Sequence, residues 1–465
     1  MRTEIKLLLF FVLGIPSLLV TLFFAINSVD EKPLPEVVKL LDWQVPPHGL
    51  DDGNGYLILR GLEAPAGQDA AQFGRALIAE EVTRFRAKAS FQPVPANEDR
   101  GPGIARLRAL HCNYPEESNC LDFYLAQDHA RVRSQMEEAL AAQPQLLERY
   151  HAIVVSPNFI DVLPPRADAV FPPYFYVTAV SEYERVRAID AIAAGKLDEG
   201  LDVFVKNALF SRRLLADSSV LISHMVALAM VQTDMRLLSE LLERYPQLAD
   251  RAEALAPLLT PIDGGKYSID HTMDYETAFN LNTIALEQEI HRRRAGEDDD
   301  GSVFGRNTGF LDQTNASLNL LFRLMTLRRE VMTSPAATFD KARADYQVKR
   351  DRELGLGVGI FYFYNPSGKI LAGLGENQYE KYAERQFDVD AWIRLVALQA
   401  KLIAGHVPQA RVADAVAHAD AAMRNPYSGQ PMKWDPAKNT LSFTGRQSSS
   451  MLPGKSKTFR AHLAF

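Results

Sequence analysis

Residues 181–207 read SEYERVRAIDAIAAGKLDEGLDVFVKN, and this segment has the clearest helical pattern in the chain. Apolar residues recur every three or four positions on both sides of one glycine: Val186, Ile189 and Ile192 before it, then Leu197, Leu201 and Phe204 after it. Because such steps follow the period of an α-helix, each half predicts a helix with one buried face. Gly195 stands between the halves, where a helix commonly ends. The stretch therefore predicts two consecutive helices joined by a short turn.

The same spacing extends along most of the chain. It occurs in residues 69–89, 121–150, 213–232, 235–245, 311–346 and 409–423. We therefore predict a mainly α fold, with a helical body over residues 56–445. Prolines and glycines around residues 257–310 indicate a long connection and a possible sub-boundary within that body.

A small β element is expected at the C-terminal end. Residues 425–431, NPYSGQP, form a dense turn signal, and the next segments, 432–434 and 440–444, have the composition of paired strands. This pattern predicts a β-hairpin closing the helical body. The remaining residues, 446–465, are rich in Ser and Lys and are predicted to form a flexible tail.

The N-terminal end carries a candidate membrane anchor. Leu7 to Ile26 reads LLLFFVLGIPSLLVTLFFAI, without a charge, and about 20 apolar residues suffice for a helix to cross a bilayer. Arg2 and Lys6 precede this run, so the N-terminus is expected in the cytoplasm. A cleavable signal peptide is the alternative, but its apolar core is normally shorter, about 7–15 residues, and ends at a small-x-small site. We predict an uncleaved signal anchor over residues 1–28, held in a bacterial inner membrane by residues 7–26.

Beyond the anchor, residues 29–55 contain four prolines, at positions 33, 35, 46 and 47, and predict an extended stalk. With the N-terminus inside, the body is expected in the periplasm. Disulfides persist in such a compartment, and the chain has only Cys112 and Cys120, separated by seven residues in HCNYPEESNC. A structural disulfide between them is the leading prediction; metal binding, redox work and unpaired thiols are the alternatives. The spacing is not the C-x-x-C of redox motifs, and a zinc site needs four ligands.

Composition excludes several functional classes. The net charge is −7, with acidic and basic residues mixed, whereas a nucleic-acid surface requires a basic excess. Gly368-Lys369 lacks the first glycine and the Ser/Thr of a phosphate-binding loop, because Phe363 and Ile370 occupy those positions. We therefore expect no nucleic acid, no nucleotide, no cofactor and no metal.

One acidic cluster offers weak catalytic candidates. Asp270, Asp274 and Glu276 surround His271, and in a helix His271 and Asp274 would lie on one face. An imidazole beside a carboxylate is suited to acid–base chemistry. The segment supplies few further groups for a complete site. His224 lies in the apolar stretch SSVLISHMVALAM and is predicted to be a core histidine.

Three segments carry a resemblance to a known group of proteins. They are DDGNGYLILRGL at residues 51–62, FYFYNPSGKILA at 361–372 and NPYSGQPMKWD at 425–435. With these segments the chain resembles a family of uncharacterised proteobacterial inner-membrane proteins that have a single N-terminal span. The resemblance implies the compartment and the architecture, and it implies no catalytic residue.

These observations favour a membrane-anchored periplasmic protein that binds a protein partner in the envelope without catalysis, for example an immunity or modulator protein. Two alternatives remain open: an envelope hydrolase with an unrecognised site, and a structural assembly factor of a secretion or pilus system. Whether the chain is an enzyme is undecided by its sequence, with the balance against it.

Overall fold

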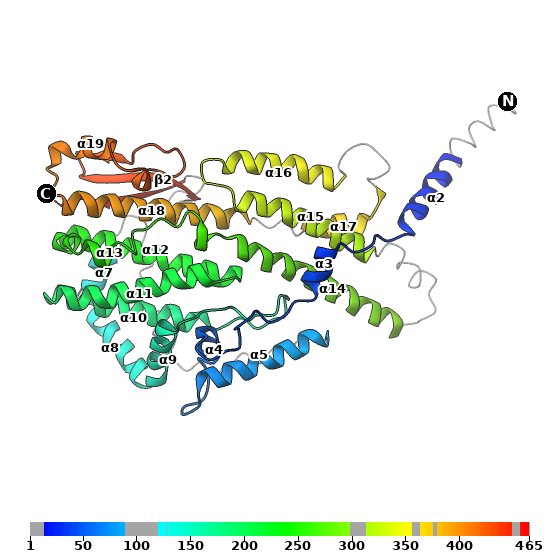
Figure 1. Cartoon of the computed structure of the whole chain (residues 1–465), viewed down its shortest axis with the longest axis horizontal. Helices are drawn as coiled ribbons and strands as arrows, with labels where there is room; N and C mark the ends of the chain where they lie inside the picture. Colours follow the sequence, from blue (N-terminus) through cyan, green and yellow to red (C-terminus); the bar gives the residue numbers. More distant parts are fainter. Residues whose placement is uncertain are drawn as a thin grey trace.

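The computed structural model describes residues 14–88, 120–126, 128–297, 313–355, 363–374, 379–448 and 456–464. In these residues the fold is mainly α, as predicted, with seventeen α-helices and a small C-terminal antiparallel sheet (Figure 1). The helices are α2 Ile15–Asn27, α3 Pro35–Leu41, α4 Gly55–Arg60, α5 Ala70–Arg86, α7 Cys120–Leu125, α8 Asp128–Ala141, α9 Pro144–Val155, α10 Tyr174–Ala193, α11 Leu197–Asp217, α12 Leu221–Arg244, α13 Ala252–Leu255, α14 Asp270–Glu297, α15 Thr314–Met332, α16 Phe339–Glu353, α17 Pro366–Leu374, α18 Glu380–Ala404 and α19 Gln409–Ala417.

A stack of long helices forms the larger core. Helices α10, α11, α12 and α18 lie side by side in that order, and the sheet covers the outer face of α18 (Figure 1). Gly195 ends α10 with a φ of +83°, a left-handed conformation that glycine adopts without steric cost. Gly200 then lets α11 approach α10, because a Cβ there would lie 2.6 Å from the Ala188 carbonyl oxygen. The predicted pair of helices around Gly195 is confirmed.

A second core lies toward the N-terminal end of the body. It joins α3, α14, α15 and α16 to the first turns of α18, around buried residues such as Met273, Leu318 and Phe339. Helix α18 is long enough to contribute its first turns to this core and its later turns to the larger one. The two cores are therefore bridged by one continuous helix.

The C-terminal sheet is larger than the predicted hairpin. Strands β1 Lys433–Asp435 and β2 Thr440–Ser448 pair antiparallel as expected, and β3 Ser456–His462 then pairs with β2. Phe443 of β2 and Phe459 of β3 stack with ring centroids 4.7 Å apart, and both are buried. The flexible tail predicted for residues 446–465 is thus corrected: alternating Phe459, Ala461 and Leu463 give the segment a buried face.

The N-terminal helix α2 differs from the rest of the body in its exposed apolar surface. Helix α2 projects from the body (Figure 1), and five of its large apolar side chains are exposed: Leu18, Leu19, Val20, Leu22 and Phe24. Residues 1–13 lie outside the described part, so the predicted span over residues 7–26 is seen only from its middle onward. Among the helices that the structure describes, none has both the length and the apolarity needed to cross a membrane.

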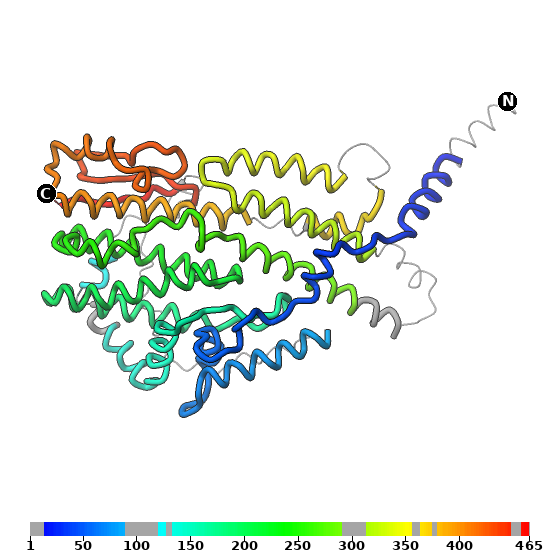
Figure 2. Tube along the Cα trace, in the orientation of Figure 1, coloured from blue at the N-terminus to red at the C-terminus, as the bar shows by residue number. Residues whose placement is uncertain are grey.

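Residues 29–55 differ from the predicted extended stalk. The chain runs along the body from α2 toward α4 (Figure 2), and it forms α3 on the way. Val37 of α3 is fully buried against α14 and α15, and the Leu34 amide donates to Asn319 Oδ1 at 2.9 Å. Pro35 stands at the start of α3, where its missing N–H costs nothing. Four prolines therefore mark a packed segment here.

The long connection predicted over residues 257–310 is also different. Helix α14 occupies 28 of those positions. Its buried positions include Thr272, Glu276 and Asn282 beside Met273 and Leu281, so no continuous apolar stripe is visible in the sequence. Helices whose buried face is partly polar escape recognition by apolar periodicity.

Candidate functional site

A groove opens at the end of the body that lies farthest from α2. It encloses about 620 Å³ between the last turn of α18, the 3₁₀ turn Pro246–Asp250, the start of α19 and the residues after β3. The C-terminus and the end of α18 mark this end of the molecule in Figure 1. Ligand pockets in proteins commonly have volumes of about 300–1,000 Å³, so the groove has the size of a binding site.

A tight turn after α18 shapes the floor of the groove. The helix ends at Gly405, and His406 adopts a φ of +46°. The amides of His406 and Val407 donate back to the carbonyls of Ile403 and Leu402, at 2.9 and 3.1 Å. Left-handed backbone is uncommon outside glycine, although histidine is among the residues enriched in it. The turn brings the His406 side chain to the groove lining.

The lining is apolar with a sparse polar rim. Leu402, Ile403, Val407, Pro246, Pro408, Leu463 and Ala464 supply the apolar surface, and Gln247, Asp250, His406 and Gln409 the polar groups. Gln409 donates to Pro436 O at 3.2 Å and Asn439 Oδ1 at 2.7 Å, which ties α19 to the β1–β2 turn. Within the described residues, Gln247, Asp250 and His406 make no side-chain hydrogen bond or ion pair. These three side chains are available to a ligand.

The predicted catalytic candidates lie elsewhere, on the surface of α14. His271 is solvent-exposed in the first turn of the helix, and Asp274 is exposed as well. Arg329 of α15 forms a fork with Asp270, at 2.5 and 2.6 Å, and pairs with Asp274. The structure therefore brings both carboxylates to an arginine. Neither His271 nor Asp274 lines the groove, and among the described residues no group of three His, Cys, Asp or Glu side chains could hold a metal ion.

Of the predicted cysteine pair, only Cys120 belongs to the described part. It is buried at the start of α7, and no cysteine in that part is a free thiol. Cys112 lies outside the described residues, so the disulfide stays a prediction. His224 is a buried core histidine, as predicted: Gln386 contacts its Nε2 at 3.1 Å, and burial lowers the pKa of the imidazole to about 4.

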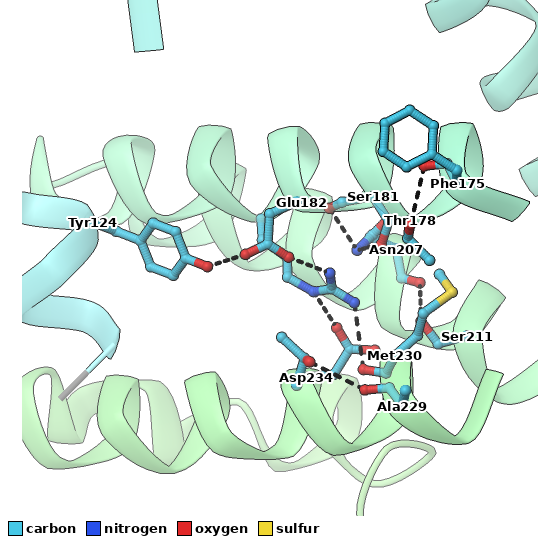
Figure 3. Close-up of polar contacts among 12 residues, drawn as sticks. Tyr124, Phe175, Thr178, Ser181, Glu182, Asn207, Ser211, Ala229, Met230 and Asp234 are labelled. Carbon is cyan, nitrogen blue, oxygen red and sulfur yellow. Dashed lines mark hydrogen bonds and ion pairs between the residues drawn. The ribbon is translucent and has the colours of Figure 1, made fainter. Parts of the chain in front are cut away.

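A buried ionic network joins α7, α10 and α12 (Figure 3). Arg185 donates to Glu182 at 2.8 Å and to Asp234 at 2.7 Å, and the three side chains are 2%, 4% and 1% exposed. The Tyr124 hydroxyl donates to the second oxygen of Glu182. Burial lowers the pKa of Arg185, but the two carboxylates outweigh it and raise the pKa above its ordinary value. Every charge is paired away from solvent, so the network holds helices together.

Several further buried carboxylates have raised pKa values, among them Asp161, Glu81 and Glu276. Burial raises the pKa of Asp161 to about 6 and those of Glu81 and Glu276 to about 7. Asp161 accepts the amides of Ser219 and Val220 at 2.8 and 3.0 Å, just before α12 begins. Glu81 pairs with Arg60, and Glu276 accepts from Tyr379 at 3.1 Å. Perturbed carboxylates can mark active sites, but none of these lines the groove, and each has a structural partner.

Sequence reasoning missed the groove because its lining comes from three separate segments of the chain. The local signal was the sequence Gly405-His-Val-Pro408, which ends one helix and begins the next. Comparison of the chain with models of protein families, with curated proteins and with solved structures finds no match. The geometry alone therefore has to support a function.

Proposed function

We propose that this chain is a membrane-anchored envelope protein, with its body in the periplasm, that binds a protein partner through the groove at its membrane-distal end. The observation that carries the proposal is the 620 Å³ apolar groove, set at the opposite end of the body from α2 (Figure 1). A site placed there faces away from the bilayer and is accessible to other envelope proteins.

The anchoring half of the proposal is supported by the surface of α2. Phe24 is 47% exposed, Leu19 56% and Leu18 66%, on a helix that leaves the body. Burial of apolar area stabilises by about 25 cal/mol per Å², so leaving such a helix in water is unfavourable. Insertion into a bilayer removes this cost, in agreement with the charge-free run from residue 7 to residue 26.

The partner-binding half is supported by the composition of the groove. Its apolar floor suits the side chains of a peptide segment, and a few polar groups at the rim suit its backbone and its orientation. Asp250 is an exposed carboxylate without an ion pair in the described part of the chain. We therefore expect an apolar segment of an envelope protein with a Lys or Arg positioned opposite Asp250.

Site-specific photo-crosslinking in intact cells tests this proposal. A photoreactive amino acid replaces Ala464 in the groove, and the matched control places it at Val348, an apolar residue of α16 that is 65% exposed. We expect one discrete crosslinked protein from position 464 and none from position 348. Val407→Asp in the floor and Asp250→Arg at the exposed rim should each abolish the crosslink.

Other outcomes contradict the proposal. Crosslinks that are the same from both positions, or that survive Asp250→Arg and Val407→Asp, would show nonspecific contact. A small apolar molecule that copurifies with the chain and is lost in Val407→Asp would assign the groove to a small ligand. The alternative of an envelope hydrolase finds no support in His271, which is exposed. Identification of the crosslinked protein separates a modulator from an assembly factor.

A further inference from the structure

The last residue of α2 is part of the folded body. Asn27 is 1% exposed, and its side-chain amide donates to Phe363 O at 2.8 Å. In return the Asn365 amide donates to Asn27 Oδ1 at 3.0 Å, and Gln313 donates to Asn27 O at 2.7 Å. Two separate segments of the body, one just before α15 and one just before α17, therefore hold the end of this helix.

The residues that follow α2 also cap α15. Gln313, at the N-cap position of α15, makes no capping hydrogen bond with its own side chain. The Asp30 carboxylate takes this role and accepts the amides of Asn315 and Ala316, both at 2.9 Å. The first amides of a helix have no partner within it, and a carboxylate both satisfies them and complements the positive end of the helix dipole. The start of α15 is therefore bonded to a residue close to the end of α2.

The next turn of α15 binds the rest of the segment through Asn319. Its side-chain amide donates to Glu31 Oε2 at 2.8 Å and to Lys32 O at 2.9 Å, and its Oδ1 accepts the Leu34 amide at 2.9 Å. Because Asn319 is 1% exposed, water competes little for these bonds. Val37 then enters the second core, where it is fully buried. The segment between α2 and α3 thus lies along α15 and is bonded to it repeatedly.

We propose that residues 27–37 form a rigid coupling between the anchor and the body, so that the two keep one relative orientation and the groove faces one direction from the bilayer. The inference rests on the anchoring role proposed above. A flexible stalk would let the body swing on its tether. Here the fixed points recur every one to three residues from Asn27 to Val37, so a swinging motion has to break several of them at once.

The coupling reaches the groove through the two cores. Helix α15 packs against α14, α16 and α17, and α18 bridges this second core to the larger one. Leu402 and Ile403, near the end of α18, line the groove. Figure 1 shows α2 and the end of α18 at opposite ends of the molecule. Because α18 is one continuous helix, the orientation set at Asn27 extends to the far end of the body.

Double electron–electron resonance on the full chain in lipid nanodiscs tests the coupling. One spin-labelled amino acid replaces Leu18 of α2, and a second replaces Val348 of α16; these residues are 66% and 65% exposed. The method gives the distribution of distances between the two labels. A rigid coupling predicts one narrow peak in the parent chain, and a flexible stalk predicts a broad distribution.

Substitutions in the segment identify the bonds responsible. The triple variant Asn27→Ala, Asp30→Ala, Asn319→Ala removes the side chains that make most of these bonds, and the narrow peak should be lost. Asp42→Ala is the matched control and should keep the peak, because this exposed side chain bonds only Gln44 within the described residues. Circular dichroism checks the folding of each variant. If the triple variant unfolds, Asp30→Ala alone replaces it and should widen the peak.

The coupling and the anchor fail in different ways. A broad distribution in the parent, or a peak that stays narrow in every folded variant, would overturn the coupling. Relaxation of the Leu18 label by oxygen and by a water-soluble nickel complex locates that label. If oxygen reaches it and nickel does not, the label lies in the bilayer, and a broad distribution leaves the anchor standing. A label that nickel reaches would overturn the anchor, and with it the coupling.

Discussion

The buried network around Arg185 gives the sharpest prediction for stability. Arg185→Met keeps most of the volume and removes the guanidinium, which leaves Glu182 and Asp234 buried without their common partner. Breaking a buried ion pair from one side destabilises by about 3–5 kcal/mol, because an uncompensated charge remains away from water. Here two carboxylates, 4% and 1% exposed, lose the same cation, so we expect the upper part of that range.

The matched control lies two residues further along α10. Arg187 is 46% exposed and bonds Glu184 at 2.9 Å. Glu184 is buried, but it keeps His151 as a second partner at 3.0 Å, so Arg187→Met should cost less than Arg185→Met. Urea unfolding of the full chain in mild detergent, followed by circular dichroism, gives both changes in free energy. The deficit of Arg185→Met should also shrink at low pH, where unpaired buried carboxylates take up protons. Equal effects of the two variants, or a deficit independent of pH, would refute the reasoning.

Three further predictions concern stability and covalent structure. Burial raises the pKa of Glu276 from 4.5 to about 7. Between these two pH values the folded chain keeps a proton on Glu276 that the unfolded chain releases. The stability that the protonated Glu276 contributes is therefore complete below pH 4.5 and is lost as the pH rises through about 7. Glu276→Gln should therefore flatten the fall in urea midpoint across that interval, and an unchanged slope would contradict the assignment. Deletion of residues 449–465 removes β3 and exposes the Phe443 ring, against which Phe459 stacks. The melting temperature should therefore fall by several degrees, whereas deletion of a flexible tail would leave it unchanged. Thiol labelling of the unreduced protein should modify neither Cys112 nor Cys120 without prior reduction, and labelling of either would exclude the disulfide.

The helical stack was predictable from the sequence because the apolar faces of its helices are continuous. Around Gly195, three apolar residues on each side repeat at helical spacing, and the structure buries all of them in the core around α10 and α11 except Leu197, which is half-buried. The β1–β2 pairing was also predictable, because turn residues frame two short segments. Both cases depend on neighbours in the sequence, which is the information that periodicity contains.

Features that depend on contacts between residues far apart in the sequence could not be predicted from local patterns. Helix α14 buries Glu276 against Tyr379, about a hundred positions later in the chain, and this polar contact hides the helix from an apolar pattern. Strand β3 depends on β2 and α18 for its pairing and burial. The groove is assembled from three segments of the chain, and its chemistry is visible only after they meet. His271 and Asp274 show the opposite error: they are close in the sequence, but both are exposed on α14, and Asp274 pairs with Arg329 of α15.

Anchoring by α2 with the body in the periplasm is the central claim, and the activity of alkaline phosphatase fused after Phe465 tests it most directly. This enzyme is active only where disulfides form. The full chain should give an active fusion, and the chain lacking residues 1–28 an inactive one. An inactive fusion to the full chain, together with bright fluorescence from a cytoplasmic reporter fused at the same position, would contradict the claim.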